Sequence, residues 1–410
     1  MTRPARLLLV TRSVRAFGDG FVALLLPAYL SALGFDALQI GLLTTATLLG
    51  SAVLTLGVGL VAHRLDARRM LIGSSILMMA TGLCFAELRQ FWPLVVVGFI
   101  GTLNPSSGDV SLFLPLEHSL LAHAGPDEKR TSLFARYSLV GSLLGALGAL
   151  AAALPAVIAR AIDLDPAAAM RAMFAGYALL GLLALALYRR LPSAEAGLGG
   201  AKQPLGASRR TVLVLAGLFS MDSFGGGFFV QSLLALWLFQ RFGLSLEAAA
   251  SFFFWSGLLS AASFPIAARI AARIGLVNTM VFTHIPSSLC IMICPFTGDL
   301  WIVLALLLVR AGLSQMDVPT RTSYVMAIVT PPERAAAASI TAVPRSLASS
   351  ASPVLAGWLM SIGSFALPLL IGGALKIAYD LLLLFMFRRV KPPEEAERTP
   401  PALTPPRARP

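Results

Sequence analysis

Ionisable side chains recur inside long apolar stretches of this sequence, where a charge needs a partner or water. At the centre of a membrane-spanning helix each would cost about 2.5 kcal/mol or more. Arg310, Asp317 and Arg321 follow one another at steps of seven and four, along one face of a predicted helix. The whole set comprises Arg15, Asp19, Asp109, Glu117, Arg136, Asp222, Arg310, Asp317, Arg321, Arg345, Lys376 and Asp380. Six members are positive and six negative, which indicates salt-bridged networks.

Two kinds of chemistry suit such charges, namely binding of an ionic solute and exchange of protons. A carboxylate in a partly desolvated cavity can load and release a proton. The candidates for this role are Asp19, Asp109, Asp222 and Asp317. Arginines favour an anionic or zwitterionic solute such as an organic acid, unless carboxylates already pair with them. Structural pairing explains any single member equally well.

A short segment occurs twice, about half a chain apart, with its charge reversed. Residues 13–21 read SVRAFGDGF and residues 220–228 read SMDSFGGGF, so that Arg15 corresponds to Asp222. A repeat with this period indicates two homologous halves. The reversal predicts an ion pair between Arg15 and Asp222 across the two halves. A bridge from Arg15 to Asp19 within the first half is the alternative.

The elements that must hold these residues are membrane-spanning helices. The chain of 410 residues is 57% hydrophobic and 13% charged, which is too little charge to cover a water-facing surface. About twelve apolar runs of about 20 residues, six in each half, are long enough to cross a bilayer as helices. We therefore expect an all-α integral membrane protein. Its expected parts are a helical bundle at 1–188, a linker at 189–210, a second bundle at 211–388 and a disordered tail at 389–410.

The formal net charge of +12 comes from Lys and Arg at the N-terminus, in alternate loops, in the linker and in the tail. This positive-inside pattern predicts that both termini and the linker are cytoplasmic, in a cell (inner or plasma) membrane. The charge therefore reports topology, and no nucleic-acid partner is expected. Three cysteines and four histidines form no metal-ligand pattern, so neither a metal nor a cofactor is expected. Two G-x-G-x-x-A matches, at 18–23 and 57–62, lie inside apolar runs and indicate helix packing, not an enzyme.

The loop after the second apolar run, GLVAHRLDARR at 59–69, resembles the signature G-x-L-A-D-R-x-G-R-R of the major facilitator superfamily. The segment ARIAARIGLVN at 268–278 resembles a worn second copy of it. The resemblance implies twelve transmembrane helices in two pseudo-symmetric six-helix bundles. It also implies that the halves rock about a site near the middle of the membrane.

Some positions of this motif match the family and two depart from it. The matching residues are Gly59, Ala62, Arg64 and Arg68. His63 stands where the family has Asp, and Asp66 stands where it has Gly. In the family the acidic residue helps to latch the cytoplasmic face, so the latch here is either weaker or carried by Asp66. Gating roles near that face are expected for Glu117, Arg136 and Arg345.

The resemblance further implies a central cavity lined by the first, fourth, seventh and tenth helices. The candidate cavity residues are Arg15, Asp19, Asp109, Phe113, Asp222, Arg310, Asp317, Arg321 and Tyr324. The twelfth helix is peripheral in the family, which makes Lys376 and Asp380 the weakest functional candidates.

These features predict a secondary active transporter that moves a small organic ion or amphipathic solute by alternating access, coupled to protons or another ion. The expected partners are this solute, the coupling ion and the lipid bilayer, and the chain is expected to act as a monomer. One alternative is a multidrug/proton antiporter that exports drugs. Residues 141–155 lack the Gly-Pro pair of such antiporters, which weakens this alternative. A non-transporting membrane sensor is a more distant alternative, because the chain has no sizeable predicted output domain.

Overall fold

In the computed structural model of the protein, residues 2–61, 66–106, 111–122, 130–192, 206, 208–330, 333–388 and 390 are described. They form helices joined by short turns, with no strand among them, so the predicted all-α fold is confirmed. The first half contains α1 (Arg3–Ala32), α2 (Ala37–Val61), α3 (Ala67–Glu87), α4 (Phe91–Ile100), α5 (Phe113–Ala122), α6 (Arg130–Ala151), α7 (Leu154–Ile162) and α8 (Pro166–Tyr188). The second half contains α9 (Arg209–Gly227), α10 (Gln231–Phe242), α11 (Leu246–Ile274), α12 (Leu276–Ile293), the 3₁₀ turn η2 (Cys294–Phe296), α13 (Leu300–Ser314), α14 (Asp317–Ile328), α15 (Arg334–Ser361) and α16 (Leu367–Phe387).

Within these ranges, nine helical passages are long and apolar enough to cross a bilayer. The other passages that a twelve-helix arrangement requires correspond to α1, α15 and the pair α4 and α5. Ionisable residues such as Arg15 and Asp19 lower the hydropathy of α1, and Arg345 and several serines do the same for α15. Residues 101–112 separate α4 from α5. The structure is therefore consistent with the predicted count of twelve.

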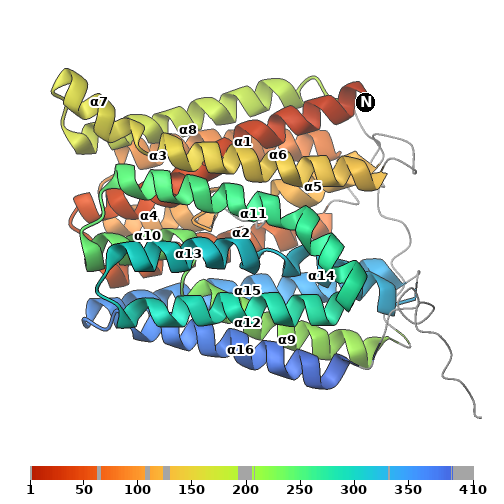
Figure 1. The fold of residues 1–410 in the computed structure, drawn as a ribbon. Helices are drawn as coiled ribbons and strands as arrows, with labels where there is room; N and C mark the ends of the chain where they lie inside the picture. Colours follow the sequence, from red (N-terminus) through yellow and green to blue (C-terminus); the bar gives the residue numbers. More distant parts are fainter. Residues whose placement is uncertain are drawn as a thin grey trace, which may run out of the picture.

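The helices lie side by side along a common direction, with most of the first-half helices at the top of Figure 1 and most of the second-half helices below. We call the end where α1 begins and α16 ends the terminal end, and the other end the opposite end. In the first half α1 packs against α6 and α8, and in the second half α9 packs against α15 and α16. Corresponding helices thus make corresponding contacts, as the repeat predicts.

Passages are interrupted between α4 and α5, between α9 and α10, between α13 and α14 and, near the opposite end, between α6 and α7. An interruption frees backbone groups that must find partners inside the protein, because lipid offers none. The N–H of Ser232, at the start of α10, donates to the carbonyl of Pro105 at 3.1 Å. The interruption after α4 in the first half therefore meets the interruption after α9 in the second half.

Close contacts between the two halves lie toward the opposite end, where α2 packs against α15 and α6 against α11. Gly41 allows the first of these approaches, because a Cβ atom there would lie 2.6 Å from the carbonyl oxygen of Pro353. Arg160 and Glu247 form a salt bridge between the halves at this end, at 2.5 Å. The halves are thus in contact at the opposite end in this conformation.

Replacing Gly41 with valine is expected to push α2 away from α15 and to open the opposite end, because the added side chain meets backbone atoms. Thr45 lies at this interface and accepts a hydrogen bond from the N–H of Val354 at 3.0 Å. In a variant without the three native cysteines, Thr45→Cys should react severalfold faster with a bulky thiol reagent when Gly41→Val is added. Gly57→Val is the matched control on the same helix, because a Cβ atom there meets nothing within 4 Å. Equal reactivity with both substitutions would contradict the packing role of Gly41.

Candidate functional site

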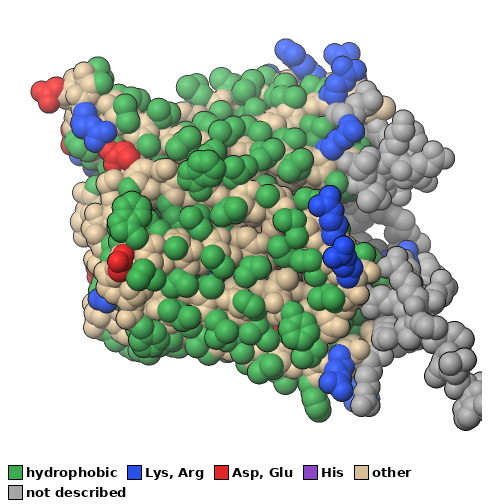
Figure 2. Space-filling model, in the orientation of Figure 1, with side chains coloured by type: hydrophobic (Ala, Val, Ile, Leu, Met, Phe, Trp, Pro, Cys, Tyr) green, Lys and Arg blue, Asp and Glu red, His purple; other side chains and the backbone are tan. Residues whose placement is uncertain are grey.

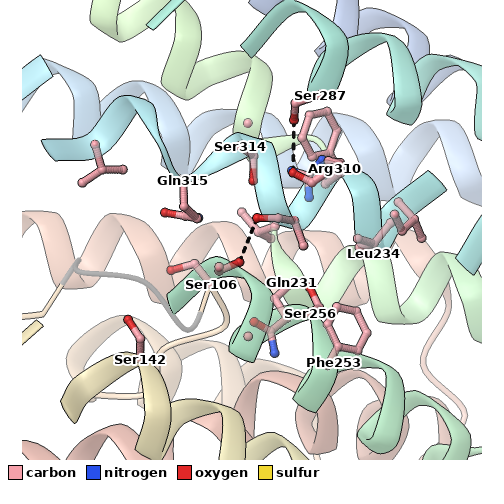
Figure 3. A pocket seen from close by; sticks show the side chains of 18 of the residues that line it. Ser106, Ser142, Gln231, Leu234, Phe253, Ser256, Ser287, Arg310, Ser314 and Gln315 are labelled. Atoms are coloured by element: carbon pink, nitrogen blue, oxygen red, sulfur yellow. Dashed lines mark hydrogen bonds between the residues drawn. The ribbon is translucent and has the colours of Figure 1, made fainter. Parts of the chain in front are cut away.

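A cavity of about 380 Å³ lies between the two halves. Its lining comes from α1 and α6 of the first half and, for the most part, from helices α9 to α14 and α16 of the second half. The charged or titratable lining residues are Arg12, Asp222, His284, Arg310, Asp317, Arg321 and Lys376. Seven serines and two glutamines add hydroxyl and amide groups, several of which point into the same space in Figure 3. Such a lining suits a polar solute.

Six ionisable side chains of the second half form a buried group that we call the second-half cluster. Its members are Asp222, His284, Asp317, Arg321, Lys376 and Asp380. At its centre, Asp222 Oδ1 lies 2.6 Å from Lys376 Nζ, and Oδ2 lies 3.1 Å from Arg321 Nη1. Arg321 also pairs with Asp317, one turn earlier on α14, at 3.0 Å. One carboxylate of α9 thus joins α14 to α16 through hydrogen-bonded ion pairs.

His284 of α12 links two carboxylates of the second-half cluster. Its Nδ1 lies 3.0 Å from an oxygen of Asp380, an arrangement in which the Nδ1–H donates to the carboxylate. Its Nε2 faces Lys376 Nζ at 3.4 Å and Asp222 Oδ1 at 3.7 Å. The neutral ring accepts from Lys376 at Nε2, whereas a second proton on Nε2 would face Asp222. The two protonation states of His284 therefore have different partners.

A second buried group occupies the first half, and we call it the first-half network. Its members are Thr11, Arg15, Glu117, Tyr137 and Tyr188. Glu117 pairs with Arg15 and accepts hydrogen bonds from the hydroxyls of Tyr137, of Tyr188 at 2.5 Å and of Thr11 at 3.0 Å. Arg15 Nε in turn donates to Tyr188 Oη at 3.1 Å. The carboxylate is completely buried and saturated with donors, as a charge inside a membrane requires.

The predicted ion pair between Arg15 and Asp222 is wrong for this conformation. Arg15 pairs with Glu117 of its own half, and Asp222 pairs with Arg321 and Lys376 of its own half. Each half thus has a buried arginine–carboxylate pair of its own. In the first half the repeated segment supplies the arginine, and in the second half it supplies the carboxylate.

Of the predicted cavity residues, the lining includes Asp222, Arg310, Asp317 and Arg321. Arg15, Asp19, Phe113 and Tyr324 are not part of this lining, and their role in a solute path stays a prediction. The guanidinium of Arg15 lies over the ring of Phe113, with Cζ 4.2 Å from the ring centroid, inside the first half. Asp19 forms no ion pair with Arg15 among the described residues. Tyr324 donates to the carbonyl of Val390 at 3.1 Å, near the terminal end.

Several contacts were not foreseen in the sequence. Glu117 was expected near the cytoplasmic ends as a gating residue, and the structure instead places it at the centre of the first-half network. Lys376 and Asp380 ranked as the weakest candidates, yet Lys376 lines the cavity and Asp380 binds His284. His284 could have been identified from the sequence as a functional candidate, because it is a titratable side chain in the middle of an apolar run.

The remaining predicted residues belong to the terminal end or lie outside the described residues. Asp109, His63 and Arg64 are outside them, and Gly59 lies within α2. Asp66 caps α3 by accepting from the N–H of Arg68 at 3.0 Å, and Arg68 Nη2 donates to the carbonyl of Arg189 at 2.5 Å. The first contact lies within the first half and the second reaches the start of the linker. Neither joins the two halves, and a latch by Asp66 stays a prediction. The remaining two expected gating residues are Arg136, exposed on α6, and Arg345, half-buried on α15.

Glu333 holds the start of α15 at the terminal end. It accepts hydrogen bonds from the N–H of Gly206 and from the hydroxyl of Thr330, the latter at 2.9 Å. Hydrogen bonds from Ser208, Gly206 and Thr330 hold the pKa of Glu333 below its ordinary value. A residue from the expected linker thus contacts the second half.

Comparison with known proteins places this architecture in a family. The sequence matches the family model described as "Major Facilitator Superfamily" over residues 8–316 and 223–409. The membrane protein YJR124C of Saccharomyces cerevisiae is 24% identical over 426 residues, which cover 94% of each chain.

Three solved transporters share the fold at low sequence identity. The nucleoside transporter NupG has a TM-score of 0.72 at 14% identity, over 94% of this chain and 99% of that one. A bacterial homologue of the human lysosomal transporter Spinster, inward-facing and occupied, has a TM-score of 0.74 at 16% identity, over 97% and 98% of the two chains. A D-xylose–proton symporter has a TM-score of 0.72 at 15% identity, over 92% and 96%. Since the family model matches most of the chain, this multi-pass membrane protein belongs to the Major Facilitator Superfamily of transporters.

Proposed function

We propose that this protein is a secondary active transporter that moves a small polar organic solute by alternating access and couples this movement to a proton at the second-half cluster. The observation that carries the proposal is the charge of that cluster. Among the described residues, three carboxylates, Asp222, Asp317 and Asp380, pair with two permanent cations, Arg321 and Lys376. With His284 neutral the cluster therefore holds one excess negative charge, and one added proton removes it. Burying an uncompensated charge is costly, which favours binding of that proton.

The proton site and the solute site share side chains. Asp222, His284 and Lys376 line the cavity, while Asp380 is buried behind His284. A proton on His284 Nε2 would face Asp222, the carboxylate that also holds Lys376 and Arg321. Protonation would thus redistribute the contacts that join α9, α12, α14 and α16, and a solute in the cavity would meet a different charge.

The similar solved proteins support coupling by protons, since one of them is a D-xylose–proton symporter on the same fold. The serines and glutamines of the lining favour a polar solute over an amphipathic drug, which argues against the drug-exporting alternative. A sensor would have no need of a cavity that holds both a titratable cluster and polar side chains left unpaired in the described part of the chain.

The distribution of basic residues supports a cytoplasmic terminal end. Figure 2 shows Lys and Arg side chains gathered at that end, while the flank between the two ends is covered by hydrophobic side chains. Under the positive-inside rule, this distribution supports a cell-membrane protein with both termini on the cytoplasmic side. Because the halves touch at the opposite end, we infer that the conformation described here offers its cavity to the cytoplasm. We further propose that a single chain, made of the bundles 1–188 and 211–388 with the linker 189–210, is the transporting unit.

Transport measurements in proteoliposomes test the coupling site. The solute is first identified by protein-dependent counterflow of labelled compounds, which needs no proton gradient. His284→Gln and Asp380→Asn are expected to keep counterflow and to lose accumulation driven by an imposed pH gradient, because the cluster can no longer exchange its proton. Asp19→Asn is the matched control, since Asp19 is a buried carboxylate outside the cluster. Full gradient-driven accumulation by both cluster variants, or its loss in Asp19→Asn alone, would contradict the proposed site.

A further inference from the structure

Arg310 is a cation of the cavity for which the described residues offer no carboxylate partner. Its guanidinium lies over the ring of Phe229, with Cζ 4.9 Å from the ring centroid. Arg321 and Lys376, the other second-half cations of the lining, both pair with carboxylates. Arg310 lies ten residues into α13, which at 1.5 Å per residue puts it roughly 15 Å from the opposite end, about half the thickness of a bilayer core.

An uncompensated guanidinium at this depth leaves the site incomplete. A cation over an aromatic ring gains only about 0.5 to 2 kcal/mol, less than the cost of a charge at mid-membrane. The side chain is partly exposed to the cavity, so a dissolved anion can reach it. Arg15 and Arg321 each pair with a carboxylate of their own half, which removes their preference for an anionic solute. Arg310 has no such pair among the described residues and keeps this preference.

We propose that Arg310 binds the carboxylate of the transported solute, and that this solute is a small hydroxylated monocarboxylate. This inference rests on the proposed transport function. The planar guanidinium offers parallel N–H donors that match a carboxylate. One uncompensated positive charge matches one negative charge, whereas a dianion such as sulfate would leave an excess negative charge in the membrane interior.

The rest of the solute would meet polar groups that have no partner among the described residues. The side chains of Gln231, Ser256, Ser314 and Gln315 line the cavity, and no hydrogen bond of theirs occurs within the described part of the chain. They come from α10, α11, the last residue of α13 and the break that follows it, on several sides of the space that Arg310 enters in Figure 3. Ser287 differs from them, because its hydroxyl donates to the carbonyl of Arg310 at 3.5 Å. A solute with several hydroxyls could satisfy the free groups, and about 380 Å³ is enough for one small molecule.

Binding to the purified full-length protein in detergent tests this inference by titration calorimetry. The probes are gluconate and lactate, with the neutral compounds sorbitol, lactamide and D-xylose and the dianion sulfate as comparisons. At least one monocarboxylate should bind, and lactate should bind more tightly than lactamide. Arg310→Gln is expected to weaken monocarboxylate binding by about tenfold to a hundredfold, because a charge-assisted pair is lost. Arg310→Lys should bind with intermediate affinity, since it keeps the charge without the planar donors.

Arg241→Gln is the matched control, because Arg241 is exposed at the end of α10 and outside the lining. It should bind like the unaltered protein. The inference is overturned if neither monocarboxylate binds, if lactate and lactamide bind equally, if sulfate binds most tightly, or if Arg310→Gln binds as well as Arg241→Gln. Comparison of lactate with lactamide needs no variant, so the test stands even when Arg310→Gln does not fold.

The calorimetric test is independent of proton coupling, because it uses no gradient. Arg310-dependent binding in a protein that shows no gradient-driven accumulation would support this inference and reject the proposed coupling. Conversely, His284-dependent accumulation of D-xylose with no effect of Arg310→Gln would support the coupling and reject the monocarboxylate.

Discussion

Replacing Glu117 with glutamine is expected to lower the free energy of unfolding by about 3 to 5 kcal/mol, since it leaves the buried Arg15 without its counter-ion. Both residues are fully enclosed, and the hydroxyls of Tyr137 and Tyr188 also depend on the same carboxylate. The amide keeps the shape of the side chain but removes its charge. Unfolding in mixed micelles, followed with a thiol-reactive dye, measures the loss, because Cys294 is buried in the folded protein.

The salt bridge between Arg160 and Glu247 provides the matched control. It joins the same two kinds of charged group, but the side chains are 69% and 28% exposed. Glu247→Gln should therefore change the free energy of unfolding by about 1 kcal/mol or less. A similar loss of unfolding free energy for both substitutions, or no loss for Glu117→Gln, would contradict the prediction that burial makes the pair of Arg15 and Glu117 important for stability.

Replacing Asp222 with asparagine is expected to cost a similar amount, about 3 to 5 kcal/mol, because Lys376 and Arg321 both lose a partner. Lys376→Gln should also destabilise the protein, by leaving Asp222 with one cation fewer. The double variant should lose less than the sum of the single losses, by about 0.5 to 3 kcal/mol, since the two residues are in direct contact. The same unfolding measurement provides all the values of this double-mutant cycle.

A second double-mutant cycle tests the pair between Arg15 and Asp222 that the repeat suggested. Arg15→Gln combined with Asp222→Asn should give additive losses, because each residue has its partners in its own half. Strong coupling between Arg15 and Asp222, with none between Asp222 and Lys376, would restore the pair across the halves.

The helical fold, its two halves and the charges inside them were predictable, because apolar run length and a repeated segment are local properties of the sequence. The partner of each charge was not. Arg15 has Asp19 at a suitable spacing on its own helix, yet it pairs with Glu117, which is 102 residues away. The choice depends on how α5, α6 and α8 surround the end of a long flexible side chain, and the hydroxyls of two tyrosines contribute to it.

Arg310 and Arg321 show a second limit of sequence reasoning. Their spacing predicted one face of one helix, but the passage breaks between α13 and α14, and each helix then has its own orientation. As a result Arg321 reaches two aspartates, while Arg310 lies over Phe229. A break of two residues is short compared with a hydrophobic run, so no average over the run detects it.

The separation of the second-half cluster from Arg310 has an electrical consequence. With His284 neutral, the cluster carries one negative charge and Arg310 carries one positive charge, so the two sites together are neutral when empty. A proton on the cluster together with a monocarboxylate on Arg310 leaves the two sites neutral again, whereas either ligand alone leaves a net charge. Moving a unit charge through a membrane potential costs or releases about 2.3 kcal/mol per 100 mV. On both proposals, empty and doubly loaded carriers would reorient without sensing the voltage, and the pH gradient alone, with no current, would drive accumulation.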